Sequence, residues 1–412
     1  MEKHQLVIIG GGSAGIACAL GAYEAGLTDI IIVERDFEYG GVLQQCIHTG
    51  FGLHTFNEDL SGPAYAEKYF QMIKDINEIK CYFNATVTNI DDNKVLTIQS
   101  KKGLSKIQAE AIVLASGCYE RTPGAINITG DRVKGVYTAG SAQKYINKYG
   151  VLLGKRVFIL GSGDIGLIMA RRMSLEGAKV LGVAEIMPYS NGLARNIKQC
   201  LEDFDIPLYL SHTVESVHGY DKLNSITLIK VDEKLQKIEG SERRIDCDLL
   251  LVSVGLIPDN SLIEELGVKL DPKTKGAIID NNYMTSFEGI FACGNALHVH
   301  DLVDYVSIES KRCGQAASEY ILNGLDSSDC INNELGNGIS YVIPQKFHKG
   351  KNIDFMFRSN AILKNCAIHI SGNGIDKTIN KPAIVPSEMQ MVSIKADELK
   401  DLDACLKWEI IQ

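Results

Sequence analysis

Residues 5–35 read QLVIIGGGSAGIACALGAYEAGLTDIIIVER, which is an apolar run, a glycine-rich turn, a small-residue stretch and a second apolar run. Leu6–Ile9 predicts a buried parallel strand, and the glycines that follow predict a tight turn into a helix. Gly10 permits the turn, Gly12 lets a pyrophosphate approach the backbone, and Gly15 lets helix and strand pack closely. The N-terminus of that helix offers N–H groups and the positive end of a dipole to phosphates. The stretch therefore predicts a dinucleotide-binding unit, with Glu34 placed to accept hydrogen bonds from ribose hydroxyls.

A second copy of this pattern occupies residues 156–185, RVFILGSGDIGLIMARRMSLEGAKVLGVAE. Five of its positions lie 151 residues after their counterparts without a gap: Gly161, Gly163, Gly166, Gly177 and Glu185 match Gly10, Gly12, Gly15, Gly26 and Glu34. A constant offset over five positions indicates an internal repeat, and thus two dinucleotide sites. Ile186 and Met187 follow the second acid where a 2′-phosphate would need a basic residue, so this site favours NADH over NADPH.

Composition limits the class of protein. A chain of 412 residues is long enough for two or three domains, and 45% hydrophobic with 23% charged residues is typical of globular proteins. A formal charge of −9 argues against nucleic acid as a partner. The eleven cysteines include no Cys-x-x-Cys pair, which fits reduced thiols in the cytoplasm, and no apolar run is long enough to span a membrane.

The remaining segments indicate how the domains are connected. The stretch EYGGVLQQCIHTGFGLHTF, residues 38–56, is expected to form a loop over a cofactor. A strand in TSFEGIFACGN, residues 285–295, and a helix from Glu309 to Leu322 follow the second glycine unit, which predicts that the second domain is inserted in the first. Residues 323–337 are expected to form a linker, and alternating runs after it predict a β-rich domain.

The expected fold is therefore α/β, with two Rossmann-like domains and a small β-rich C-terminal domain. The expected boundaries are 1–120 with 285–330 for the first dinucleotide-binding domain, 121–284 for the second dinucleotide-binding domain and 335–412 for the C-terminal domain.

The two glycine units and TSFEGIFACGN resemble the two-dinucleotide-binding flavoprotein superfamily, which includes the pyridine nucleotide-disulfide oxidoreductases. SGCYERTPG and GVYTAGSAQKYINKYG resemble a branch with subunits of hydrogen cyanide synthase, opine oxidases and the large subunit of sarcosine oxidase. GGVLQQCIHTGFGL, GSGDIGLIMARRMSLEGAKV, SVGLIPDN and CGNALHVHDLVDYVS are similar to the small FAD- and NAD-binding oxidoreductases of bacterial glycerol-3-phosphate (glp) operons. This similarity covers most of residues 1–325 and, less distinctly, PAIVPSEMQMVSI near the end.

The resemblance implies FAD at the first site and NAD(H) at the second. By motif match the FAD contacts are Gly10, Gly12, Ser13, Ala14, Gly15, Glu34, Arg35, Gly41, Val42, Val87, Ser116, Gly117, Gly294 and Asn295. The corresponding NAD contacts are Gly161, Gly163, Asp164, Ile165, Gly166, Glu185 and Gly255. Most superfamily members have Asp at the position of Asn295, but an amide still hydrogen-bonds a ribityl hydroxyl.

Four residues are candidates for chemistry beyond cofactor binding. Cys46 and His48 lie in the loop expected near the flavin, and a reactive thiol there would need thiolate character and access. His298 and His300 belong to the polar run HVHDLVD, which follows the expected ribityl contact. That run could bind a metal, shuttle a proton to reduced flavin, or form an ordinary solvated loop. No metal is expected.

Because Cys46 has no partner cysteine close in sequence, reduction of thioredoxin or glutathione is not expected. The main expectation is a cytoplasmic FAD enzyme that exchanges hydride with NAD(H) and relays electrons to or from a partner dehydrogenase in glycerol-3-phosphate oxidation. One alternative is an NADH oxidase or peroxidase that uses Cys46. The other is a non-catalytic nucleotide-sensing subunit.

Overall fold

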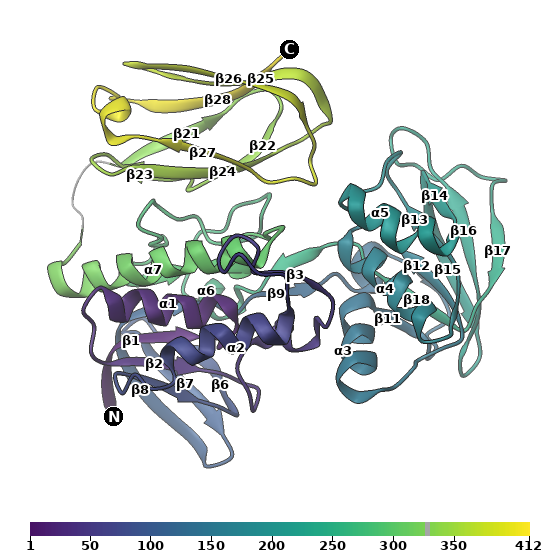
Figure 1. Ribbon diagram of the computed structural model, residues 1–412, viewed down its shortest axis with the longest axis horizontal. Coiled ribbons are helices and arrows are strands. Elements are labelled where there is room, and N and C mark those ends of the chain that lie inside the picture. The colour runs from purple at the N-terminus through teal and green to yellow at the C-terminus, as the bar shows by residue number, and fades with distance from the viewer. Residues whose placement is uncertain (326–329) are drawn as a thin grey trace. The chain divides into compact units, whose positions relative to one another are not determined.

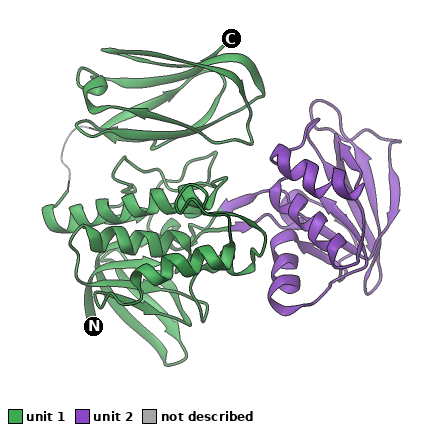
Figure 2. Ribbon diagram, in the orientation of Figure 1, with its two compact units in different colours: residues 1–118, 258–412 green, residues 119–257 purple. Residues whose placement is uncertain are grey.

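The computed structural model describes residues 1–325 and 330–412, and the chain packs as two compact units. Unit 1 contains residues 1–118 and 258–412, and unit 2 contains residues 119–257 (Figure 2). The chain passes from unit 1 to unit 2 at strand β9 (Cys118–Glu120) and returns at strand β19 (Leu256–Pro258). These two strands pair with each other.

Unit 1 begins with a seven-stranded mixed sheet. Its strand order is β5 (Ile79–Tyr82), β2 (Ile30–Val33), β1 (Glu2–Ile9), β8 (Gly103–Leu114), β7 (Val95–Ser100) and β6 (Ala85–Ile90), with β20 (Ile290–Ala292) also paired to β8. The central strands are parallel and β6, β7 and β8 form an antiparallel meander. The four-residue β2 is buried throughout, as its unbroken apolar sequence predicts.

The helices α1 (Ser13–Glu24), α2 (Gly62–Ile73) and α7 (Val303–Asn323) accompany this sheet (Figure 1). The shorter elements are β3 (Thr49–Phe51), β4 (Leu60–Ser61), α6 (Ser261–Glu264) and the 3-10 turns η1 (Gly41–Gln45) and η4 (Gly294–Ala296). α1 and α7 pack backbone to backbone, because a Cβ at Gly21 would overlap the carbonyl of Lys311 and one at Gly314 that of Cys18. This contact joins the first glycine turn to a helix from the far end of the sequence.

Unit 2 contains a five-stranded parallel sheet and a four-stranded sheet. The parallel sheet has the order β11 (Val136–Thr138), β18 (Leu249–Val252), β12 (Arg156–Leu160), β13 (Lys179–Glu185) and β14 (Leu208–Leu210). The other sheet has the order β10 (Thr129–Gly130), β15 (His212–Gly219), β16 (Leu223–Lys230) and β17 (Arg243–Asp246). The helical elements are η2 (Pro123–Ile126), α3 (Ala139–Tyr149), α4 (Asp164–Leu175), α5 (Ala194–Cys200) and η3 (Glu202–Phe204).

The C-terminal part of unit 1 is built from strands around its own core. One sheet has the order β23 (Lys346–His348), β21 (Cys330–Leu335), β28 (Cys405–Ile411), β25 (Leu363–Gly372) and β26 (Ile375–Ile384). The other has the order β22 (Ile339–Ile343), β24 (Ile353–Ser359) and β27 (Gln390–Ile394), and η5 (Ala396–Leu399) precedes β28. Trp408 and Phe355 pack at 5.0 Å between ring centroids in this core, as the alternating sequence predicts.

The expected α/β class, with two Rossmann-like sheets and a β-rich C-terminal region, is confirmed. Two expected boundaries differ from the structure. Residues 258–284, expected in the NAD domain, belong to unit 1, because Ile263, Val268 and Ile279 are buried in its core. The expected linker 323–337 ends early, because residues 330–335 form strand β21, which pairs with β23 and β28; residues 326–329 lie outside the described part.

Candidate dinucleotide sites

The first glycine turn has the geometry that its sequence predicts. Gly10 has φ +108°, and a Cβ there would overlap the carbonyl of Ala115 at the end of the neighbouring strand. A Cβ at Gly15 would overlap the carbonyl of Gly10, so helix α1 starts as close to β1 as glycine allows. A Cβ at Gly12 would meet no atom within 4 Å, so that side of the turn is open. Because Gly12 caps α1 without a side chain, the helix's first N–H groups fit a pyrophosphate.

Glu34 is buried at the end of β2 and is tied to this turn. One carboxylate oxygen accepts a hydrogen bond from the backbone N–H of Gly11 at 2.6 Å, and the other accepts from Asp36 N–H at 2.7 Å. A carboxylate oxygen has two lone pairs, so acceptor capacity remains for a ribose hydroxyl. The acid therefore fixes the turn and also fits the predicted ribose contact.

The second turn repeats this geometry in unit 2. Gly161 has φ +103°, a Cβ at Gly166 would overlap the Gly161 carbonyl, and Gly163 is open like Gly12. Glu185 is buried and accepts from Ser162 N–H at 3.1 Å and from Met187 N–H at 3.0 Å. These hydrogen bonds join the positions 151 residues after Gly11, Glu34 and Asp36, so the sequence repeat is also a repeat of contacts.

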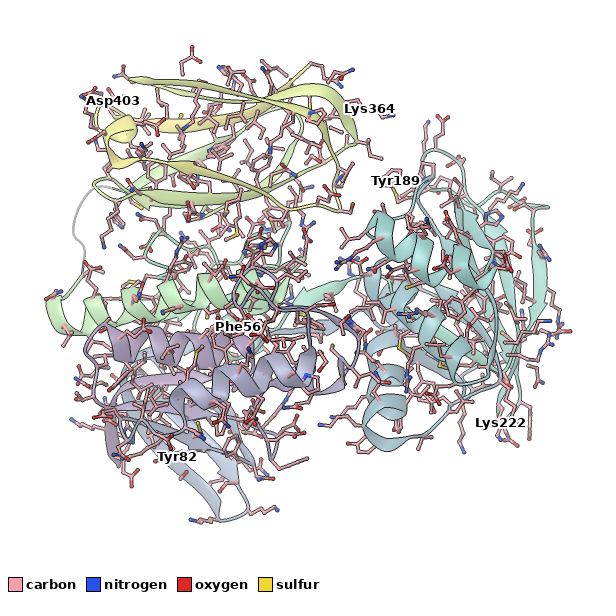
Figure 3. The ribbon with its side chains drawn as sticks, viewed as in Figure 1. Phe56, Tyr82, Tyr189, Lys222, Lys364 and Asp403 are labelled. Carbon is pink, nitrogen blue, oxygen red and sulfur yellow. The ribbon has the colours of Figure 1, made fainter. Side chains whose placement is uncertain are left out.

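The second turn carries a feature that the sequence did not reveal. The carboxylate of Asp164, a residue predicted to contact NAD, accepts hydrogen bonds from Leu193 N–H at 2.9 Å and from the Asn196 amide at 2.6 Å. The Ser162 hydroxyl also accepts from Asn191 N–H at 3.1 Å. The side chains of Ser162 and Asp164 thus bind the segment 190–196 to the second turn. Figure 3 labels Tyr189, which precedes this segment.

The Gly294–Asn295 turn, predicted to face the ribityl chain, lies against the first glycine turn. Gly294 has φ +63°, and a Cβ there would come within 2.8 Å of the Ala14 Cβ. Its backbone N–H donates to Glu309 Oε1 at 2.7 Å, from the second turn of α7. The structure therefore brings the first and last parts of the predicted FAD site together.

His298 and His300 converge on the other oxygen of Glu309. Their Nε2 atoms lie 2.9 Å and 3.2 Å from Glu309 Oε2, and all three side chains are at most 2% exposed. Burial alone would raise the pKa of Glu309, but the two histidines hold that pKa well below its usual range. Burial, then the charge of His300, lowers the pKa of His298 to about 4. Sequence reasoning found both histidines but missed Glu309, which was only the expected start of a helix.

Residues of HVHDLVD also connect this loop to two other segments. Asp304 accepts from Gly52 N–H at 3.1 Å and from Thr55 N–H at 2.9 Å, so it holds the segment after η1. Asp301 pairs with Arg358 of β24 and accepts from Met389 N–H at 2.7 Å. The C-terminal sheets therefore hold the loop that follows Asn295.

Cys46 and His48 follow η1 in the segment before β3. Burial raises the pKa of the Cys46 thiol to about 12, and its Sγ lies 3.3 Å from the carbonyl of Val42. A thiol with this pKa has little thiolate at neutral pH. The ring of His48 lies 4.9 Å from that of Phe51, and its Nδ1 is 3.1 Å from the Thr49 carbonyl.

Three other cysteines meet in the core of unit 1. Cys18 of α1, Cys293 after β20 and Cys313 of α7 are buried, with sulfur atoms within 4.8 Å of one another. Burial raises the pKa values of Cys18 and Cys313, whereas hydrogen bonds with those two thiols lower the pKa of Cys293. The sequence analysis did not predict this cluster, because its members are far apart along the chain.

The remaining predicted contacts occupy varied positions. Ser116 Oγ donates to the Asp259 carbonyl at 2.7 Å, and Asp259 N–H donates to the Gly117 carbonyl. Val87 is buried in β6, whereas Arg35 and Val42 are exposed. Other predicted contacts lie on turns or helix ends: Ser13 begins α1, Ile165 is the second residue of α4, Gly41 begins η1, and Gly255 has φ +107°.

None of the helices in the described residues combines the length and apolar character that a membrane crossing requires.

Comparisons with known proteins agree with this geometry. The sequence model of the pyridine nucleotide-disulphide oxidoreductase family matches residues 4–316. The hydrogen cyanide synthase subunit HcnB of Pseudomonas protegens is 25% identical over 76% of this chain and 67% of its own length. The NAD(P)H coenzyme A polysulfide/persulfide reductase of Pyrococcus horikoshii is 26% identical over 73% of this chain and 64% of its own length. The chain thus spans about two thirds of these relatives.

Among solved structures, the thioredoxin reductase of T. acidophilum superposes with a TM-score of 0.62 at 22% identity. The match covers 78% of this chain and 98% of that one. A likeness at this identity supports the fold.

Proposed function

The chain belongs to the pyridine nucleotide-disulphide oxidoreductase family, and we propose that it exchanges hydride between NAD(H) and a bound FAD and relays the electrons to or from a partner dehydrogenase. FAD and NAD(P)H are the cofactors of this family and of this chain. The observation that carries the proposal is the pair of open glycine turns, each with a buried acid hydrogen-bonded to its backbone. We assign FAD to the turn of unit 1 and NAD(H) to that of unit 2.

The cofactors supply the redox chemistry, which is hydride transfer between nicotinamide C4 and flavin N5. The chain's own residues bind and orient. The turn N–H groups hold the pyrophosphates, Glu34 and Glu185 meet the ribose hydroxyls, and Asn295 meets the ribityl chain. A productive complex requires the two reacting atoms to be held at roughly 3–3.5 Å with water excluded.

NADH is the proposed substrate at the second site because Glu185 stands where a 2′-phosphate would lie, and Ile186 and Met187 follow it. A carboxylate repels a phosphate and accepts hydrogen bonds from hydroxyls. We expect a kcat/KM for NADH at least tenfold above that for NADPH, and Glu185→Ser to narrow the ratio. Equal use of both nucleotides by the wild-type protein would contradict the assignment.

The proposal includes no redox-active disulfide. Cys46 is supported as a non-reactive thiol by its raised pKa. The cluster of Cys18, Cys293 and Cys313 is supported as packing because all three side chains are buried. Thiol titration in denaturant should give eleven thiols before and after anaerobic NADH reduction. A gain of two thiols on reduction would show a disulfide and overturn this part of the proposal.

The partner dehydrogenase and a role in glycerol-3-phosphate oxidation rest on the motif resemblance. One relative is named as a subunit of hydrogen cyanide synthase, which supports an assembly with another chain. We propose a cytoplasmic location because the cysteines are scattered through the sequence, as is typical of reduced thiols. Co-purification from the native source, followed by NADH oxidation assays with and without the recovered partner, tests the relay. Failure of any co-purifying dehydrogenase to accept electrons from the reduced protein would contradict it.

Anaerobic addition of NADH tests the central proposal. The purified protein should be yellow and its flavin absorbance should bleach with about one NADH per FAD, since both cofactors carry two electrons. Protein that binds both cofactors without bleaching would favour the alternative of a nucleotide-sensing subunit.

A second candidate function, an NADH oxidase or peroxidase that uses Cys46, is favoured by one comparison. The NADH oxidase of Methanocaldococcus jannaschii is 26% identical over 72% of this chain and 64% of its own length. The raised pKa of Cys46 argues against it. A Cys46→Ser protein should keep its NADH-linked turnover, and loss of a peroxidase activity in that variant would favour the second candidate.

A further inference from the structure

The three buried cysteines of unit 1 come from three elements that pack tightly together. Cys18 lies on α1, Cys293 follows β20 and Cys313 lies on α7, and each side chain is 0% exposed. A Cβ at Gly314 would lie 2.0 Å from the Cys18 carbonyl, so the two helices touch beside the cluster. Among the described residues, this is the one group of three cysteines whose sulfur atoms all lie within 4.8 Å of one another. The core of unit 1 therefore holds three thiols ready to share a ligand.

The spacing of the sulfur atoms suits a single central ion. Bonds of about 2.3 Å, the usual length between a metal and a thiolate, place three sulfur atoms roughly 3.5–4 Å apart around one centre. The thiols are within 4.8 Å already, so small side-chain rotations bring them to that spacing. Thiolate ligands select soft ions. The cluster thus has the donor type and the geometry of a soft-ion site.

Ser310 of α7 adds an independent polar atom to this cluster. Its side chain is 0% exposed, and its hydroxyl has no hydrogen-bond partner among the described residues. The hydroxyl can donate to a thiolate at Cys293, and it contributes, after the other two thiols, to the lowered pKa of Cys293. A buried hydroxyl without a partner is costly. It gains a partner when the Cys293 thiol loses its proton to a bound ion.

The buried surroundings decide which soft ion fits. Three thiolates around Zn²⁺ would leave one net negative charge, and around Cu⁺ they would leave two. An unbalanced charge is costly in a site with no exposed side chain. The buried carboxylate of Glu309 adds to this cost, because it opposes a negative charge at Cys293. A trivalent ion bound by three thiolates is neutral and avoids the penalty.

We propose that Cys18, Cys293 and Cys313 form a binding site for a trivalent thiophilic metalloid, of which arsenic(III) is the probe. In the binding step, As(OH)₃ reacts with three thiols to give As(SR)₃ and three water molecules. Three As–O and three S–H bonds break while three As–S and three O–H bonds form, and arsenic stays trivalent. The inference goes beyond the proposed function, in which these thiols only pack, and it requires neither cofactor. Because the cluster is closed to solvent, entry requires local opening of the contact between α1 and α7.

Native mass spectrometry of the reduced, full-length protein tests the inference after overnight incubation with sodium arsenite. The expected mass gain is one arsenic atom minus three protons, which reports three As–S bonds. X-ray absorption at the arsenic edge should show three sulfur neighbours and no oxygen neighbour. No gain in mass, or a gain that corresponds to two thiols and a retained hydroxyl group, would overturn the inference.

Cysteine-to-alanine variants locate the bound arsenic. Cys18→Ala and Cys313→Ala each remove one sulfur atom without adding a polar group. The matched controls are Cys200→Ala and Cys247→Ala, because these thiols are also buried but belong to unit 2. In equilibrium dialysis the Kd for arsenite should rise by about tenfold or more in the cluster variants and change less than about threefold in the controls. Unchanged binding in a cluster variant, or an equal loss in a control, would contradict the assignment.

Two measurements on the wild-type protein cover the case in which a cluster variant fails to fold. Arsenite should raise the midpoint of thermal unfolding, because a ligand that binds the folded core stabilises it. A tenfold excess of zinc chloride should leave the arsenic in place, because a zinc complex of the three thiolates would be charged. An unchanged midpoint, or displacement of arsenic by zinc, would overturn the inference. So would stoichiometric zinc or copper in the purified protein with sulfur as its ligands.

Discussion

The two glycine turns have the same backbone geometry but are held by different neighbours. In unit 1 the first turn is met by main chain, since Gly40 N–H donates to the Gly11 carbonyl at 2.8 Å, and the Gly294 turn from the far end of the sequence packs beside it. In unit 2 the turn is fastened to residues 190–196 by the side chains of Ser162 and Asp164. Local sequence thus makes the turn, and the surrounding elements differ in how they enclose it. We expect the first site to retain its cofactor and the second to exchange it.

The largest effect is expected where a Cβ would overlap backbone. Gly15→Ala and Gly166→Ala are equivalent changes, and each should cost about 3 kcal/mol because the turn must move to admit the methyl group. Gly15→Ala should lose FAD, whereas Gly166→Ala should retain FAD and lose reduction by NADH. FAD per chain after gel filtration, with urea unfolding followed by far-ultraviolet circular dichroism, measures both. A Gly15→Ala protein with a full complement of FAD would contradict the assignment of FAD to the first turn.

The next largest effect is a loss of stability at acidic pH, which is expected in unit 1. The pKa of His298 is lowered to about 4, so the unfolded state takes up a proton as pH falls through about 6.5 while the folded state stays neutral. Glu309 acts in the same direction below about 4.5, since its pKa is also lowered. Unit 1 should lose about 2 kcal/mol between roughly pH 6.5 and 4. Flavin fluorescence reports the release of FAD.

His298→Gln should flatten this pH dependence of FAD release in the upper part of the range. An unchanged slope in that variant would assign the pH response to other groups.

A smaller and more selective effect is expected at the open glycines. A Cβ at Gly12 or Gly163 meets no atom within 4 Å, so Ala at either position should leave the stability of the cofactor-free protein unchanged. Each methyl group would occupy the side on which the pyrophosphate approaches. Gly12→Ala should weaken FAD binding about tenfold, and Gly163→Ala should raise the KM for NADH about tenfold, roughly 1.4 kcal/mol each. Calorimetry and steady-state kinetics measure these changes.

If Gly12→Ala binds FAD as the wild type does while Gly15→Ala does not, the backbone at Gly12 is not the phosphate contact. The first turn would then have a structural role that its sequence motif does not predict.

The smallest effect concerns the side chains that are specific to unit 2. Asp164→Ala removes the acceptor for Leu193 N–H and the Asn196 amide, and should cost about 1 kcal/mol. Because these bonds hold residues 190–196, the KM for NADH should rise while FAD content stays constant. Asn196→Ala removes only one of the two bonds and should have about half the effect. A loss of FAD in Asp164→Ala would show that the two sites are not independent.

Much of the fold and of both glycine turns could be predicted because the relevant interactions are local. The roles of Gly10, Gly12 and Gly15 follow from steric rules over a few residues. The glycines 151 residues later have the same spacing, so the same roles could be predicted for the second turn. Helix α7 was predicted with a late start at Glu309. It begins at Val303, and Asp304 in its first turn accepts hydrogen bonds from Gly52 and Thr55, which are far away in sequence.

The sequence by itself determined the α/β class, the two dinucleotide turns and their acids, since strand, turn and helix signals lie within about thirty residues. Only the tertiary structure decided that Glu309 joins Gly294, His298 and His300, that Arg358 holds Asp301, and that Cys18, Cys293 and Cys313 meet. It also moved residues 258–284 into unit 1. The physical reason is that these contacts form between segments whose separation along the chain carries no information about their distance in space.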